Sequence, residues 1–216
     1  MYNFISNIFR LFSCFIVFLI LMYKIYTTDG LIIESRIFGE SNKIYFILTR
    51  DFGLIRATAQ GVCKVESKQK FGLQTLSFSK ISLVKGKEIW KITSAVPVEN
   101  VFYNLTGQKE KLNLFIRVIS LVRKLLVEEE KEPIFFDVVK SLYEFLKTEN
   151  ANNKDKISSA ELLTVMKILH ASGYLGENKN FGNLLKDDDF SDETINNLKR
   201  IKKEMLKEIN LIMGNI

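Results

Sequence analysis

The chain has few of the residues that build metal centres and thiol-based sites. Among its 216 residues are two cysteines, one histidine and two prolines. Cys14 and Cys63 lie far apart in the sequence, and together with His170 they fall short of the four ligands of a structural zinc site. We therefore expect no metal and no other cofactor. Two cysteines outside any C-x-x-C pair are also typical of a protein from the reducing cytoplasm.

The sequence also lacks the common signatures of catalysis. It contains no glycine-rich phosphate-binding loop of the G-x-x-x-x-G-K-[ST] or G-x-G-x-x-G type. The lone His170 follows the apolar face of a predicted helix, a position typical of a packing or boundary residue. The acidic run 187–189 lacks the spaced ligands and the glycine of a calcium-binding loop, so we expect a solvated linker there. These absences favour a protein that is not an enzyme and takes no small-molecule substrate.

What the sequence does have is a long region in which hydrophobic side chains alternate with period two. The run 44–49 is rich in aromatic and β-branched residues, and the turn after it contains Gly53, which can take the positive φ of a hairpin. The same pattern predicts further strands at 31–38, 54–59, 73–84 and 88–96, with Pro97 ending the last. Five short antiparallel strands suit a closed Greek-key barrel, the OB-fold, better than an open sheet with two exposed edges.

After Pro97 the hydrophobic period changes from two to 3.6, which indicates helices. The apolar stripes predict one helix over 109–127 and a second that opens at Pro133. A capping box at 158–161 predicts the start of a third helix, and Ser191 caps a fourth. The fold class is therefore α+β: an OB-fold barrel in 24–97, followed by a helical domain in 98–216 without further sheet.

Residues 1–23 form an apolar N-terminal extension that does not match the rest of the chain. Its uninterrupted apolar run, 11–23, is shorter than the roughly 20 residues that a bilayer-spanning helix needs. Three interpretations stay open: a membrane anchor, a signal peptide, and translation from an upstream start with Met22 as the true initiator. We favour Met22, because it stands a few residues before the first predicted strand. Membrane association by residues 1–23 is the minority interpretation.

The positive charge of the chain belongs to the predicted barrel. The formal net charge is +6, and residues 24–97 hold twelve basic and six acidic residues, whereas 98–216 hold eighteen basic and nineteen acidic residues. A basic barrel favours a polyanionic partner, because each phosphate that a lysine or arginine neutralises releases a counterion. The loop 61–70 sharpens this prediction, since three of its lysines lie between two strands where a backbone contact can form.

Several stretches of the chain resemble the bacterial DNA repair and recombination mediator family RecO. In the barrel region they are Tyr26–Ile33, Phe38–Ile44, Leu48–Ile55, Ala59–Val62 and Ser67–Lys68. Farther on, Glu161–Leu163 and Ile168–Tyr174 are similar to the helix of that family that ends in Gly-Tyr. The resemblance extends from about Met22 to the C-terminus and is more specific in the barrel than in the helices.

The resemblance implies a recombination mediator of the RecF pathway of DNA repair. Such proteins bind single- and double-stranded DNA, anneal complementary strands, and work with RecR and single-strand binding protein to load RecA at gaps. The implied location is the cytoplasm, in association with the nucleoid. Many members of the family carry a four-cysteine zinc site after the Gly-Tyr, but residues 175–185 contain no cysteine, so no metal is expected here.

The candidate DNA-binding residues are basic side chains of the barrel. An OB barrel offers a groove in which lysines and arginines follow the phosphate backbone while exposed aromatic residues stack on bases. Three candidates lie in the loop and three on predicted strands: Lys64, Lys68, Lys70, Arg36, Arg50 and Arg56. Trp90 is a further aromatic candidate for stacking, or else part of the barrel core. The alternative function is a membrane-anchored module that uses the barrel to bind proteins.

Overall fold

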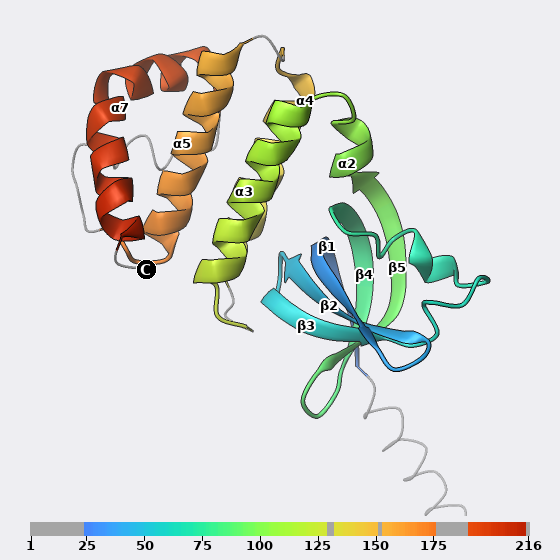
Figure 1. Cartoon of the computed structure of the whole chain (residues 1–216). Coiled ribbons are helices and arrows are strands. Elements are labelled where there is room, and N and C mark those ends of the chain that lie inside the picture. The colour runs from blue at the N-terminus through green and yellow to red at the C-terminus, as the bar shows by residue number, and fades with distance from the viewer. Residues whose placement is uncertain (1–23, 129–131, 151–152, 176–189, 215–216) are drawn as a thin grey trace, which may run out of the picture.

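The computed structural model describes residues 24–128, 132–150, 153–175 and 190–214 (Figure 1). The strands are β1 (Ile25–Phe38), β2 (Asn42–Thr49), β3 (Gly53–Ala59), β4 (Ser77–Lys85) and β5 (Trp90–Asn100). The helices are η1 (Lys68–Lys70), α2 (Val101–Asn104), α3 (Lys109–Leu125), α4 (Pro133–Thr148), α5 (Lys154–Ala171) and α7 (Asp192–Met213). In the described residues after Asn100 there is no strand, so the predicted order of a barrel followed by helices is confirmed.

The five strands close into a barrel in the order β1-β2-β3-β5-β4, as predicted for an OB-fold. All neighbours pair antiparallel except β3 and β5, which close the barrel in parallel. Strand β1 pairs with β4 through its first half and with β2 through its second half. Gly30 lies where the two pairings overlap, and a Cβ atom there would be only 2.8 Å from Ile81 Cδ1 and 2.9 Å from Ile47 Cγ2. The close approach therefore requires glycine.

Strand β2 is buried on both of its faces, which explains why its sequence is hydrophobic almost throughout. Tyr45 and Ile47 point into the barrel and pack with its interior residues. On the opposite face Phe46 is 7% exposed, and Leu48 is fully buried under the helical region. Burial raises the pKa of the Tyr45 hydroxyl to about 12. A period of two is visible in β2 only as a change of environment between its two faces.

The helices pack against one side of the barrel and share a core with it. This core joins barrel residues Leu31, Leu48, Leu54 and Phe78 to the apolar faces of α3, α4, α5 and α7. Helix α4 contacts β2 and β3, while α5 and α7 lie on the far side of α3 and α4 from the barrel (Figure 1). The outer face of β5 and most of that of β4 point away from the helices.

A buried lysine joins α3 to the end of α4. The ammonium group of Lys111, whose residue is 1% exposed, donates hydrogen bonds to the carbonyl oxygens of Leu146 (2.7 Å) and Glu149 (2.5 Å). These carbonyls belong to the last turn of α4, where backbone acceptors have no partner within the helix. Burial lowers the pKa of Lys111, and the nearby Glu149 partly offsets that effect.

Several predicted element boundaries were wrong. Strand β1 begins at Ile25, not Leu31, and β4 begins at Ser77, not Leu73. Strand β5 does not stop at Pro97 but continues to Asn100, because the register shifts beside the Ser79–Pro97 pair. Such a bulge interrupts the ladder of hydrogen bonds, and a strand tolerates proline there.

The capping box predicted at 158–161 does not start the third helix. Helix α5 begins four residues earlier, where the Asn153 side chain accepts a hydrogen bond from the backbone N–H of Lys156. Glu161 instead pairs with Arg117 of α3, with Nε–Oε1 and Nη2–Oε2 distances of 2.8 and 2.9 Å. The predicted cap of the last helix is confirmed, since the Ser191 hydroxyl accepts from the backbone N–H of Thr194.

The N-terminal extension 1–23, on which three interpretations differ, lies outside the described residues. In the part of the chain that is described, no helix is long and apolar enough to cross a membrane.

Candidate nucleic-acid interface

Arg50 holds the barrel against the helical region. Its guanidinium Nη1 lies 3.1 Å from Asp29 Oδ2 of β1, and its Nε lies 3.0 Å from Asp137 Oδ1 of α4. The guanidinium carbon also lies 5.0 Å from the centroid of the Phe136 ring. An arginine predicted from sequence as a phosphate contact is thus engaged with two carboxylates and an aromatic ring at the barrel–helix junction.

The two other candidate arginines are also paired with carboxylates. Arg36 Nε lies 2.7 Å from Glu34 Oε1 on the same strand, and Arg56 Nε lies 3.8 Å from Glu128 Oε2 beyond α3. Arg36 and Arg123 of α3 both lie over the Phe46 ring, at 5.5 and 4.2 Å from its centroid. The acids that neutralise these arginines lie far from Arg50 and Arg56 in sequence, so no local pattern reveals the pairing.

The three candidate lysines lie on the loop between β3 and β4, as predicted. Lys64, Lys68 and Lys70 are exposed, and within the described residues no ion pair involves them. Val62 and Leu73 anchor the loop in the barrel interior. Their contribution to DNA binding stays a prediction.

The same loop is fixed beside β5. The Gln69 side-chain amide in η1 donates to the carbonyl oxygen of Thr93 (2.7 Å). A Cβ atom at Gly72 would be 2.5 Å from the carbonyl oxygen of Ala95, so only glycine allows the loop to come this close to the strand. The lysines of the loop are therefore held next to the uncovered strand β5.

Sequence reasoning missed four more lysines on this side of the barrel. Lys80 and Lys91 are on β4 and β5, and Lys85 and Lys87 lie at the hairpin between these strands. All four are exposed. A charge count restricted to residues 60–96 would have found them, since this segment holds seven lysines, two glutamates, and no arginine or aspartate.

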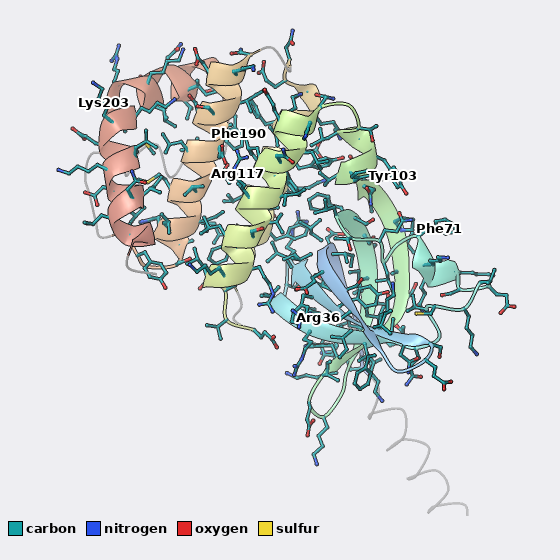
Figure 2. The ribbon with its side chains drawn as sticks, in the orientation of Figure 1. Arg36, Phe71, Tyr103, Arg117, Phe190 and Lys203 are labelled. Carbon is teal, nitrogen blue, oxygen red and sulfur yellow. The ribbon has the colours of Figure 1, made fainter. Side chains whose placement is uncertain are left out.

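The exposed aromatic residues are not the ones that the sequence suggested. Trp90 is 4% exposed and packs in the barrel against Tyr26 and Phe52, with ring centroids 5.5 and 5.1 Å away. Phe71 and Tyr103, by contrast, are 66% and 61% exposed. Figure 2 shows both on the same side of the molecule, on either side of the end of β5.

A charged cluster at the end of β5 connects the strand to α4. The Glu99 carboxylate accepts hydrogen bonds from the Tyr143 hydroxyl (2.6 Å) and the Lys147 ammonium (3.0 Å). Burial disfavours the charged form of Glu99, but these hydrogen bonds and the nearby Lys140 outweigh it and lower the pKa of the carboxyl. Burial, together with the hydrogen bond to Glu99, raises the pKa of Tyr143 to about 12.

Replacing Glu99 with glutamine is expected to destabilise the protein at neutral pH and much less in acid. A carboxyl with a lowered folded-state pKa stabilises the fold above its unfolded pKa, and this stabilisation is lost as the pH falls through the folded value. Urea unfolding of both proteins at pH 7 and pH 3 measures the effect. Glu110→Gln, in an exposed pair with Lys154, is the matched control with little expected change. An equal loss at both pH values would contradict the prediction.

Metal binding stays a prediction of absence. In the described ranges, no group of three or more histidine, cysteine, aspartate or glutamate side chains is placed to hold an ion. His170 is exposed in the last turn of α5, in keeping with the predicted boundary position. The acidic run 187–189 and most of the cysteine-free stretch 175–185 lie outside the described residues.

The barrel has recognisable relatives. Residues 22–101 match the family model described as "Recombination protein O N terminal". The chain is 26% identical over 146 residues to the DNA repair protein RecO of Alkaliphilus metalliredigens, covering 68% of this chain and 57% of that protein. It is 31% identical over 112 residues to RecO of Heliobacterium modesticaldum, covering 52% and 41%. For RecO of Dehalococcoides mccartyi strain 195, the identity is 29% over 155 residues, covering 70% and 58%. The chain spans about half the length of these curated relatives.

Proposed function

Because residues 22–101 carry the N-terminal domain of the RecO family, we propose that the chain is a DNA-binding recombination mediator in DNA repair. It binds single- and double-stranded DNA, anneals complementary strands and helps to load a recombinase at gaps. The observation that carries the proposal is the match of this segment to a closed OB barrel with a lysine-rich surface.

The lysine-rich surface supports a mechanism without turnover chemistry. Two complementary strands repel each other through their phosphates, and a protein that neutralises phosphates brings them together while releasing counterions. Contacts to phosphate carry no sequence information, so the same surface serves any pair of complementary strands. We therefore propose a binding protein and not an enzyme, one that needs no cofactor and no small-molecule substrate.

The proposed partners follow from the relatives. A mediator of this family acts with RecR and single-strand binding protein and supports the loading of RecA. Its place of work is the cytoplasm, on the nucleoid. Strands coated with single-strand binding protein are the substrate that distinguishes a mediator from a simple DNA-binding protein.

An annealing assay tests the proposed function. Two complementary labelled oligonucleotides, one coated with single-strand binding protein, are mixed with the full chain at 50 mM and 200 mM salt, and duplex formation is followed over time. We expect faster annealing with the chain present and a smaller effect at the higher salt. No binding to single-stranded DNA even at 50 mM salt, measured by fluorescence anisotropy, would refute the proposal.

A further inference from the structure

The outer surface of the barrel is divided into a covered half and an uncovered half. OB-folds commonly bind oligonucleotides on the face of strands 2 and 3. Here Leu48 and Leu54 on that face are fully buried under the helices, and Phe46 lies beneath Arg36 and Arg123. On the other half, Val96 and Val98 of β5 are 58% and 61% exposed. The usual face is thus largely occupied by the chain itself, and β4 and β5 remain open.

The charge follows the same division. Residues 24–59 hold five basic and four acidic residues, whereas 60–96 hold seven lysines against two glutamates. All seven lysines are exposed: Lys64, Lys68, Lys70, Lys80, Lys85, Lys87 and Lys91. The arginines of the first segment are paired with Glu34, Asp29, Asp137 and Glu128. The uncovered half of the barrel therefore carries nearly all of its unneutralised positive charge.

The lysines and the exposed aromatic residues follow the length of β5. Lys80 is directly opposite Val96 on β5, and Lys91 lies five residues before Val96, roughly 16 Å away at 3.3 Å per residue. Phe71 follows η1 and precedes Gly72, which contacts Ala95. Tyr103 lies just past the end of β5, in α2. Positive charge thus lies along the strand, and exposed rings lie beside it and at its end.

We infer that a single strand of DNA binds along the outer face of β4 and β5, with its phosphates on Lys80 and Lys91 and its bases stacked on Phe71 and Tyr103. The inference rests on the proposed function and assigns it a site that differs from the usual face of the fold. Charge complementarity favours a nucleic acid over a protein segment, and unpaired bases match the exposed rings because stacking works for every base. The loop lysines Lys68 and Lys70 flank the same path.

Two variants separate the two kinds of contact. Lys80→Gln with Lys91→Gln is expected to lower the slope of log affinity against log salt by about 1.4 for single strands, since each phosphate contact contributes about 0.7. The fall in affinity between 50 and 200 mM salt then becomes about sevenfold smaller. Phe71→Ala with Tyr103→Ala is expected to weaken binding at least fivefold per side chain, without a change in the slope.

The measurement is fluorescence anisotropy of a labelled oligothymidylate with the full chain across a salt series. Lys109→Gln with Lys203→Gln is the matched control, because both lysines are exposed on the helical region (Lys203 is labelled in Figure 2). The emission of the single, buried Trp90 confirms that each variant has an intact barrel.

Each outcome decides a separate question. If the unaltered chain binds but the Lys80/Lys91 variant keeps its slope, or loses no more than the control, the site on β4 and β5 is refuted and the proposed function stands. If the aromatic variant keeps its affinity for DNA, base stacking is refuted, and the exposed rings are then free to contact a protein. If the unaltered chain does not bind single strands at all, the proposed function itself falls.

Discussion

Changing Lys64, Lys68 and Lys70 together to alanine is expected to flatten the salt dependence of single-strand binding by about two units of slope. All three are exposed on the loop that Gln69 holds beside β5, and the described residues offer them no carboxylate partner. Three lost phosphate contacts make the fall in affinity between 50 and 200 mM salt about 18-fold smaller. Affinity should weaken alike for all sequences, because phosphate contacts do not distinguish bases.

The matched control for this triple variant is Lys109, Lys199 and Lys203 changed to alanine on the helical region. Both triple variants remove the same charge from exposed positions, so a general loss of electrostatic attraction affects them equally. Thermal melts should show little change in either, since exposed substitutions usually cost under about 0.5 kcal/mol. A slope that stays unchanged in a folded Lys64/Lys68/Lys70 variant would place the DNA contacts elsewhere.

Changing Phe78 to alanine is expected to lower the free energy of unfolding by about 3–5 kcal/mol, the usual cost of removing a buried phenylalanine side chain. Phe78 of β4 is 3% exposed and stacks on Tyr143 of α4, with ring centroids 5.2 Å apart and an interplanar angle of 30°. It also meets the Phe136 ring edge-on at 6.0 Å. Urea denaturation followed by circular dichroism measures the loss.

Phe71→Ala is the matched control for Phe78→Ala, because it removes the same side chain from a position that is 66% exposed. Its unfolding free energy should change by about 0.5 kcal/mol or less. We propose that residues 24–97 and 98–216 are two domains held together by the core around Phe78 and by Arg50. An equal effect of the two substitutions would contradict the structural importance of this contact.

The barrel could be predicted from sequence because its signals are local. The turn at Gly53, which has a φ of 65°, and the hairpins on either side of it lie within a few residues of each other. The cap at Ser191 is similarly local and was predicted correctly. Where a local signal had a competitor nearby, the prediction was wrong: Asn153 caps α5 in place of the capping box at 158–161.

The candidate site could be predicted only in part, because the paired and unpaired cations look alike in sequence. Arg50 and Lys68 were equally plausible contacts, yet Arg50 is bound by Asp137, 87 positions farther along the chain. Which face of a strand is covered depends on the packing of α4 on β2 and β3, and no pattern within the strands reveals it. Trp90 and Phe71 exchanged their expected roles for the same reason.

The most direct test of the account is to locate a bound single strand by photo-crosslinking. An oligonucleotide containing 4-thiothymidine is bound to the full chain at low salt and irradiated, and the crosslinked peptides are identified by mass spectrometry. The account predicts crosslinks within residues 60–103, with Phe71 and Tyr103 among the modified side chains. Crosslinks confined to β2 and β3, or to the helices α3, α4, α5 and α7, would contradict it.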